Sequence, residues 1–180
     1  DINKAGIART FQNIRLFKNL TALDNVKIAM HKNIKYGTLQ AILRTPNYYR
    51  EEERVEQQAE ELLKVVHLYD KRNELASNLP YGEQRRLEIA RALATKPKVL
   101  FLDEPAAGMN PQETADLTRL IHQIKDDFHL TVILIEHDMS LVMKICERIY
   151  VLDYGKCIAQ GTPEAIKNNR RVIEAYLGED

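Results

Sequence analysis

The sequence predicts an α/β fold in which a helical subdomain precedes a parallel sheet. Three short runs rich in apolar and β-branched residues have the character of strands, namely residues 98–103 (KVLFLD), 130–138 (LTVILIEHD) and 148–155 (RIYVLDYG). Segments with helical periodicity separate these runs, and alternating strands and helices are typical of a parallel sheet. No convincing strand lies between residues 24 and 95, and the opening residues show no obvious first strand.

Two segments between the predicted strands have the pattern of packing helices. Residues 111–128 begin with proline, which favours the first position of a helix, and their apolar residues recur at helical spacing. Residues 139–149 show the same spacing. The two strand connections therefore predict successive strand–helix–strand units in one sheet. The apolar faces consist of Leu117, Leu120, Ile121 and Ile124 in the first helix, and Leu141, Val142 and Ile145 in the second.

Residues 24–95 are predicted to form the helical subdomain. Within it, residues 51–67 show an amphipathic pattern, and a second helix is expected to begin near Gly82 and to end before Pro97. The connection 31–50 is expected to be a flexible link. The apolar stripe of the 51–67 helix consists of Val55, Ala59, Leu62, Leu63 and Val66.

The rest of the chain is predicted to form a core over residues 96–162 and a C-terminal helical segment over 163–180. A turn at Tyr154 allows the following short run to pair back on the preceding strand as a hairpin. Thr162 is the residue type that caps a helix N-terminus, so the last helical segment is expected to begin there.

Composition indicates one globular domain able to bury a core. The chain has 180 residues, 44% of them hydrophobic, with 26 basic and 26 acidic side chains, so no charge bias points to nucleic acid. The longest apolar runs, VLFL and VILI, are too short to span a bilayer. Two lone cysteines, Cys146 and Cys157, fit neither a disulfide framework nor a zinc site, and we expect them reduced and partly buried in a soluble intracellular chain.

Two adjacent carboxylates follow an apolar strand in the sequence VLFLDEP. Asp103 and Glu104 would then stand at the carboxyl end of a parallel strand, where open α/β sheets bind ligands. Neighbouring strand residues point opposite ways, so we expect Asp103 to hold Mg²⁺ and Glu104 to polarise the water that attacks a γ-phosphate. Alone, this triplet would fit a simple turn after a strand equally well.

Three further features could contribute to the same chemistry. Residues 78–93 form a glycine-containing loop that opens into a helix, where backbone amides can bind phosphate, although an ordinary capped helix has the same pattern. His137 follows the second strand and could donate to a γ-phosphate, whereas a lone histidine is more often structural. Gln12 lies early in the chain, where its amide could reach metal or water.

In their order and spacing, these motifs resemble the ATP-binding subunits of ABC transporters over essentially the whole chain. By this resemblance Gln12 is the Q-loop glutamine, residues 79–84 the signature motif, residues 99–104 the Walker B strand and His137 the switch histidine. The implied fold is a P-loop NTPase core with a helical subdomain. The stretches RTFQNIRLF, LPYGEQRRLEIARAL, LDEPAAGMNP, LIEHDM and RVIEAYLGE are similar to ATPases of branched-chain amino acid importers.

The resemblance implies ATP and Mg²⁺ as cofactors and ATP hydrolysis coupled to transport. Glu104, His137 and Gln12 would be catalytic, and Asp103 with Gln12 would hold the metal. The implied partners are a second ATPase subunit, membrane permease subunits and, indirectly, a periplasmic binding protein, on the cytoplasmic side of the inner membrane and without nucleic acid. The residues implied to contact the ATP of the partner subunit are Tyr81, Gly82, Glu83 and Gln84 in the signature loop, together with Asn110 in the D-loop.

The sequence departs from the general family pattern in two motifs. Pro80 replaces the signature serine and has no N–H, so phosphate contact is expected to rest on Gly82 and the amides that follow it. Asn110 replaces a D-loop aspartate that many relatives have, and the sequence GMN agrees with the branched-chain group.

The family's phosphate loop, Gly-x-x-x-x-Gly-Lys-Ser/Thr, does not occur in these 180 residues. We therefore expect that about the first third of the protein is missing, that this chain alone does not bind ATP, and that it exposes apolar sheet surface. Two alternatives stay open. One is another ATPase of the superfamily, in DNA repair or translation, and the other is a non-catalytic interaction fragment.

Overall fold

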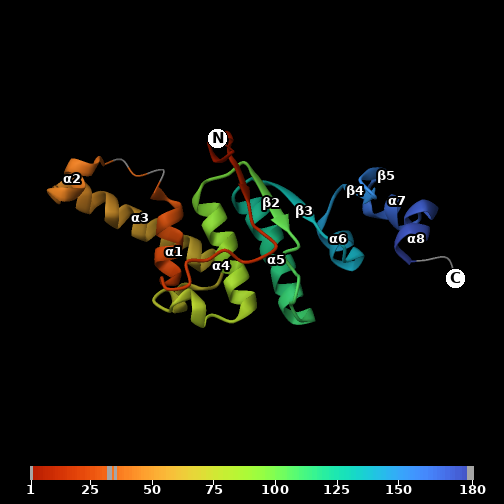
Figure 1. Cartoon of the computed structure of the whole chain (residues 1–180), viewed down its shortest axis with the longest axis horizontal. Coiled ribbons are helices and arrows are strands. Elements are labelled where there is room, and N and C mark those ends of the chain that lie inside the picture. The colour runs from red at the N-terminus through yellow and green to blue at the C-terminus, as the bar shows by residue number, and fades with distance from the viewer. Residues whose placement is uncertain (1, 32–33, 35, 178–180) are drawn as a thin grey trace. The chain divides into compact units, whose positions relative to one another are not determined.

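The computed structural model describes residues 2–31, 34 and 36–177, and the chain divides into two compact units (Figure 1). The first unit extends to Ile135, and the second begins at Glu136. The described elements of the first unit are the 3-10 helices η1 (Asn3–Ala5), η3 (Tyr69–Lys71) and η4 (Ala76–Asn78), the strands β1 (Ile7–Arg9), β2 (Val99–Asp103) and β3 (Thr131–Ile135), and the helices α1 (Ala22–Ala29), α2 (Thr38–Ile42), α3 (Pro46–Val65), α4 (Tyr81–Ala94) and α5 (Pro111–Asp127). Those of the second unit are α6 (Met139–Ile145), β4 (Ile149–Asp153), β5 (Lys156–Gly161), α7 (Pro163–Lys167) and α8 (Arg170–Leu177).

A parallel sheet of three strands in the order β1-β2-β3 forms the centre of the first unit. Strand β2 lies in the middle, and its residues Leu100 and Leu102 are fully buried. The two strands predicted at 98–103 and 130–138 are thus confirmed. Strand β1 is a correction to the sequence analysis, because three residues are too few for a strand pattern to stand out.

The third predicted strand does not belong to this parallel sheet, which is a second correction. Strand β4 pairs antiparallel with β5, as the predicted hairpin requires, in a separate sheet of the second unit. Ile149 and Val151 are buried on one face of β4, whereas Tyr150 and Leu152 are exposed on the other. This alternation is typical of an antiparallel sheet with one face on a core, and it explains why β4 need not be covered on both sides.

Helix α5 connects β2 to β3 and buries the four residues predicted for its inner face. Asn110 and Glu113 form a reciprocal capping box at its N-terminus. Strand β3 forms one edge of the sheet, and its Ile133 and Ile135 are 40% and 45% exposed. The sheet therefore presents apolar side chains at this edge, as the sequence predicts.

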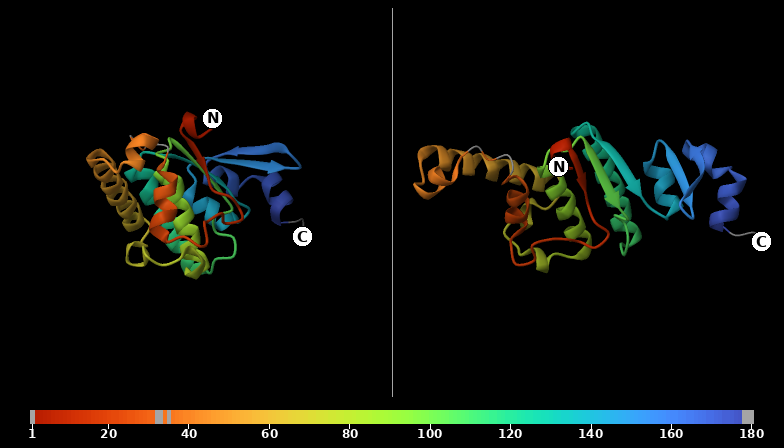
Figure 2. Two further views of the ribbon diagram at one scale, coloured as in Figure 1. Left: turned by 60° about the vertical axis from the view of Figure 1, so that its left-hand side comes forward. Right: turned by 45° about the horizontal axis from the view of Figure 1, so that its top comes forward.

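Helices α1, α3 and α4 pack against one another beside the sheet (Figures 1 and 2). The predicted stripe of the 51–67 segment is buried, and the helix extends N-terminally to Pro46, where Thr45 caps it. The described part of the 31–50 connection includes α2 and the first turn of α3, so it is more ordered than a simple link. Residues 32, 33 and 35 of that connection lie outside the described chain.

The second unit has a small apolar core of its own, built from Val142, Ile149, Val151, Ile166 and Val172. Asp138 caps α6 by accepting hydrogen bonds from Ser140 and Leu141, and these bonds lower the pKa of its carboxyl group. Thr162 caps α7, as predicted. Cys146 is half-buried, and burial raises the pKa of its thiol, whereas Cys157 is exposed, contrary to expectation.

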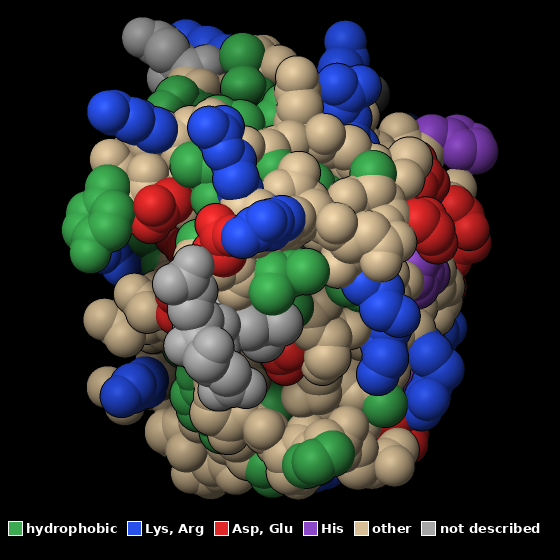
Figure 3. All heavy atoms as spheres, turned by 90° about the vertical axis from the view of Figure 1, so that its right-hand side faces the viewer, with side chains coloured by type: hydrophobic (Ala, Val, Ile, Leu, Met, Phe, Trp, Pro, Cys, Tyr) green, Lys and Arg blue, Asp and Glu red, His purple; other side chains and the backbone are tan. Residues whose placement is uncertain are grey.

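The surface carries charges of both signs. In the face shown in Figure 3, basic and acidic side chains are interspersed among hydrophobic ones. None of the helices in the described part of the chain is both long and apolar enough to cross a membrane.

Asn25 of α1 is a fully buried polar residue that fixes the turn before its helix. Its side-chain oxygen accepts from the Phe17 amide at 3.0 Å, and its Nδ2 donates to the carbonyls of Phe17 and Thr21 at 3.0 and 2.9 Å. We predict that Asn25→Ala lowers the free energy of unfolding by about 1–3 kcal/mol, because these buried groups lose their partners. Denaturant unfolding measures the loss.

The matched control for this prediction is Asn73→Ala, which truncates an exposed asparagine of the same unit. It should change the free energy of unfolding by less than about 0.5 kcal/mol. Equal unfolding midpoints for the two variants would show that the Asn25 network does not stabilise the fold.

Candidate functional site

The site begins where β1 and β2 end side by side. Their parallel register sets Arg9 opposite Phe101, and the Thr10 amide extends the ladder by donating to the Phe101 carbonyl at 2.9 Å. The chain then carries Gln12 to the edge where Glu104 follows β2. Gln12 Nε2 donates to Glu104 Oε2 at 2.6 Å, although the two residues are 92 positions apart. The structure therefore brings together two of the residues predicted to be catalytic.

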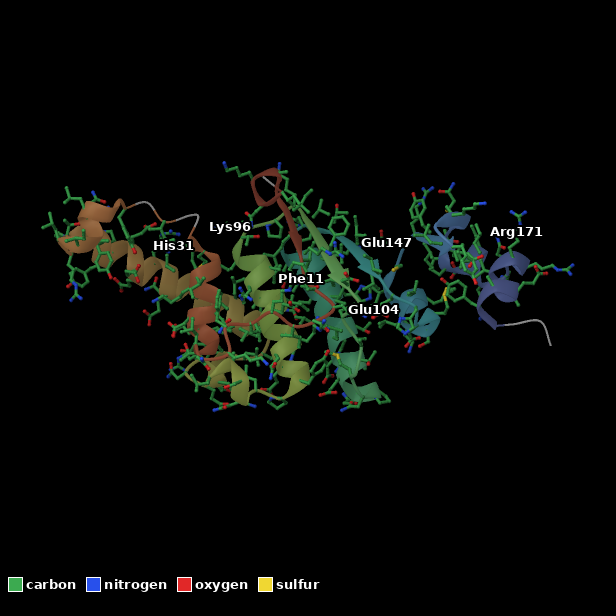
Figure 4. The ribbon with its side chains drawn as sticks, viewed as in Figure 1. Phe11, His31, Lys96, Glu104, Glu147 and Arg171 are labelled. Atoms are coloured by element: carbon green, nitrogen blue, oxygen red, sulfur yellow. The ribbon has the colours of Figure 1, made fainter. Side chains whose placement is uncertain are left out.

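Glu104 occupies an unusual backbone conformation, with φ of +43°. Left-handed geometry is costly for a non-glycine residue and is often retained at functional sites. The Glu104 amide donates to the Ile135 carbonyl at 2.9 Å, and its own carbonyl accepts from Ala107 at 3.2 Å. These bonds hold the turn in which the strand ends and fix the point from which the carboxylate extends (Figure 4).

Asp103 has a different partner from Glu104, as the alternation of strand side chains predicts. Arg9 NH2 lies 2.6 Å from Asp103 Oδ2, and the Asp103 side chain is 19% exposed. Asp103 therefore offers a partly exposed carboxylate oxygen of the kind that Mg²⁺ uses, and a protein commonly gives Mg²⁺ only one or two carboxylates. Arg9 is 54% exposed and would have to move aside for a cation to bind.

The predicted signature loop forms the N-terminus of α4. The amides of Glu83 and Gln84 donate to the Pro80 carbonyl at 3.0 and 2.9 Å, so they are already used within the turn. Within the described chain, the amides of Tyr81 and Gly82 have no acceptor, and they are the donors that this helix end offers to a ligand. From the sequence, Gly82 and the amides that follow it are expected to bind phosphate. Of these amides, those of Glu83 and Gln84 are already used, so the available donors are the amides of Tyr81 and Gly82.

The side chains of the signature loop also differ in what they can reach. Glu83 accepts two hydrogen bonds from Lys71, at 2.8 and 2.9 Å, which raise the pKa of Lys71. Gln84 Nε2 donates to the Leu79 carbonyl at 2.8 Å. Tyr81 is 44% exposed, so it is the most accessible of these side chains.

Gly82 packs closely against the Glu113 side chain of α5. A Cβ atom at this position would lie 2.9 Å from Glu113 Oε1, and Glu113 is held by its capping box with Asn110. Asn110 Oδ1 accepts from the Glu113 amide at 2.9 Å, so this predicted nucleotide ligand has a structural role as the N-cap. Glu113 thus contacts both predicted motifs, because it packs against Gly82 of the signature loop and is hydrogen-bonded to Asn110 of the D-loop.

His137 belongs to the second unit and lies two residues beyond the end of β3. Its side chain is 74% exposed, and its Nδ1 lies 3.9 Å from Glu136 Oε2. Its backbone amide donates to the same carboxylate at 3.3 Å. Gln12 and Glu104 both belong to the first unit.

Sequence analysis missed Arg85 and Glu88, two charged residues of α4 that are buried behind the site. Arg85 is 0% exposed and donates to the carbonyls of Phe11 and Gln12, and Glu88 is 5% exposed. The available signal was the i,i+3 spacing of opposite charges within an otherwise apolar helix, but the same spacing is common on solvated helices.

We predict that Gly82→Ala displaces the Glu113 carboxylate and weakens the capping box of α5. The cost of Glu113→Ala in unfolding free energy should then be smaller in the Gly82→Ala background than in the original chain, by about 0.5 kcal/mol or more. A double-mutant cycle of denaturant unfolding measures this coupling. Additive costs would mean that Glu113 accommodates the methyl group without leaving Asn110.

Comparisons with known proteins identify the family to which the sequence belongs. The family model described as ABC transporter matches residues 1–107, and the model described as branched-chain amino acid ATP-binding cassette transporter matches residues 156–180. The high-affinity branched-chain amino acid transport ATP-binding protein LivG of Escherichia coli (strain K12) is 48% identical over 178 residues, which are 99% of this chain and 70% of that protein.

Solved structures give the same result for the fold. The ADP conformation of MJ1267, an ATP-binding cassette of an ABC transporter, matches with a TM-score of 0.78 and 31% identity, over 99% of this chain and 70% of that one. A dimeric post-hydrolysis state of the ATP-binding cassette MJ0796, bound to ADP and Pi, matches with a TM-score of 0.71 and 25% identity, over 90% of this chain and 65% of that one. The chain therefore belongs to the ATP-binding subunits of ABC transporters, in the group of the branched-chain amino acid transport proteins.

Proposed function

We propose that this chain supplies the catalytic carboxylate, the Q-loop glutamine and the signature helix of an ATPase that powers uptake of branched-chain amino acids. The observation that supports the proposal most strongly is the 2.6 Å hydrogen bond from Gln12 to Glu104. It joins two residues from distant parts of the sequence at the carboxyl edge of a parallel sheet, where α/β proteins bind their ligands.

In the proposed reaction Glu104 acts as the general base. Its carboxylate accepts a proton from the water that attacks the γ-phosphate of ATP. Gln12 donates to one oxygen of this carboxylate, which fixes the orientation of Glu104, and its amide group can also contact the attacking water. His137 would donate a hydrogen bond to the γ-phosphate.

Asp103, with the amide oxygen of Gln12, is the proposed Mg²⁺ ligand. The cation would neutralise negative charge on the phosphate oxygens. Arg9 would be displaced from Asp103 when the cation binds, because both are cations that contact the same carboxylate. The Arg9–Asp103 contact defines the position of this carboxylate.

The proposed active form contains two ATPase subunits. The amides of Tyr81 and Gly82 at the N-terminus of α4 would contact the nucleotide held by the other subunit, since a helix N-terminus favours phosphate. Glu83 and Gln84 would support this turn through Lys71 and Leu79. Asn110 would contribute to the same interface while capping α5. The dimeric arrangement of MJ0796 supports a two-subunit form.

Membrane permease subunits complete the proposed transporter, and a periplasmic binding protein would deliver the amino acid to them. The ATPase would be a peripheral protein on the cytoplasmic side of the inner membrane. Branched-chain amino acids are the proposed cargo because LivG carries that description at 48% identity and because a second family model with the same description matches residues 156–180. These two observations favour transport over DNA repair or translation.

The test of this proposal uses a chimera in which the chain replaces the matching 178 residues of E. coli LivG, called here the LivG chimera. We predict that the chimera hydrolyses ATP and that Glu104→Gln lowers kcat by about a hundredfold or more while ATP binding persists, because only the proton acceptor is lost. Steady-state phosphate release and nucleotide binding measure the two effects.

Glu164→Gln is the matched control, since Glu164 is an exposed residue in the first turn of α7. It should leave kcat within about twofold of the unmodified chimera. Hydrolysis by Glu104→Gln at the rate of Glu164→Gln would refute Glu104 as the general base.

A further inference from the structure

The segment that contains Gln12 is held by a buried ion pair on α4. Arg85 is 0% exposed, and its NH1 and NH2 atoms donate to the carbonyls of Phe11 and Gln12 at 2.6 and 2.8 Å. NH1 also donates to Glu88 Oε2 at 2.9 Å. We call residues 11–15 the Q-loop segment. One guanidinium thus contacts two consecutive carbonyls of this segment and a carboxylate on its own helix.

Glu88 contacts the same segment through its other oxygen. Glu88 Oε1 accepts from the amides of Arg15 and Phe11, at 3.3 and 3.5 Å. Residues 11–15 have left the sheet at this point, because β1 ends at Arg9 and Thr10 makes the last ladder bond. The pair therefore supplies donors and acceptors to an irregular stretch of backbone that has no strand partner.

Burial makes this arrangement energetically demanding. A charge taken out of water is tolerated when it is paired and when its remaining hydrogen-bonding groups are used. The terminal nitrogens of Arg85 meet this condition, whereas its Nε is buried without a partner in the described chain. Arg85 also donates to the Tyr81 hydroxyl at 3.2 Å, so three of its contacts besides Glu88 are directed at the signature turn and the Q-loop segment. An apolar pair would fill the same space without fixing the positions of the two carbonyls.

The consequence concerns the direction of the Gln12 side chain. The backbone is fixed before Gln12 by the Thr10–Phe101 bond and at Gln12 itself by Arg85. With the carbonyl held on the α4 side, the side chain extends to Glu104. Loss of Arg85 would release the carbonyl and allow the amide to move by an ångström or more, which is enough to impair catalysis.

We propose that Arg85, paired with Glu88, is a positioning residue that aims Gln12 at Glu104. This inference rests on the proposed function, since it assigns Gln12 a part in ATP hydrolysis. It goes further because helix α4, which carries the signature loop, would affect catalysis within its own subunit. The effect would pass through hydrogen bonds to the backbone of residues 11–15 and not through the nucleotide.

The first test compares Arg85→Met with Arg86→Met in the LivG chimera. Arg86 is the neighbouring arginine of α4, and it is partly exposed and contacts Val66 and Glu83. We expect Arg85→Met to lower kcat by about tenfold to a hundredfold with the KM for ATP within about twofold, because positioning and not nucleotide affinity is lost. Arg86→Met should keep both constants within about twofold. Equal kcat values for the two variants would overturn the proposal.

The second test asks whether Arg85 acts through Gln12. Gln12→Ala should lower kcat, and adding Arg85→Met to it should lower kcat by less than about twofold more, because the side chain to be positioned is already gone. A full additional loss would show that Arg85 acts elsewhere and would overturn the inference. Unchanged hydrolysis by Gln12→Ala would contradict the proposed role of Gln12 itself, and an unmodified chimera without ATPase activity would contradict the proposed function.

A folding defect is separated from a positioning defect by a paired variant. Arg85→Met alone leaves the Glu88 carboxylate buried without its cation, whereas Arg85→Met with Glu88→Leu leaves no unpaired charge and should keep the fold. In the chain itself, this double variant should show faster amide hydrogen exchange at residues 11–15 than the unmodified chain, and unchanged exchange at residues 7–9. In the chimera, the same double variant should keep the lowered kcat of Arg85→Met. Restored kcat, or unchanged exchange at 11–15, would contradict the proposal.

Discussion

The parallel pairing of β1 with β2 is the constraint on which the site depends. Three residues of β1 align with Val99, Leu100 and Phe101, and this register fixes where the chain leaves the sheet after Thr10. A shift of one residue would turn every β1 side chain to the opposite face and move Gln12 away from Glu104. The strand is short, so its position must also be secured by contacts outside the ladder, and Arg9–Asp103 and Gln12–Glu104 are two such contacts.

Helix α4 secures the same segment from the other side. Its buried residues are distributed around most of the helix, which is typical of a helix enclosed by its neighbours and not of one lying on a surface. In that position Arg85 and Glu88 are almost completely buried, and most of their hydrogen bonds are made with the backbone of the Q-loop segment. Arg91 of the same helix contacts the chain further on. It donates to the Arg15 carbonyl, and its Cζ atom lies 5.0 Å from the centre of the Phe17 ring.

The end of β2 and the start of α5, which carry candidate site residues, could be predicted from local sequence patterns. The apolar run into Asp103 and Glu104 is long enough to define β2, and Pro111 marks the start of α5. Strand β1 could not be found because three residues give no periodicity, and β4 was assigned to the wrong sheet because an apolar run does not reveal its partner. Arg85 and Glu88 were not identified because burial of a charge depends on tertiary enclosure, which the helical pattern does not contain.

The most direct measurement is a calorimetric titration of Mg-ATP into the Glu104→Gln form of the LivG chimera, with the mass of the protein followed by light scattering. The account predicts a binding heat and a doubling of the mass, because the site remains able to bind the nucleotide while hydrolysis no longer removes it. No binding heat with an intact fold would contradict the claim that these residues build an ATP site.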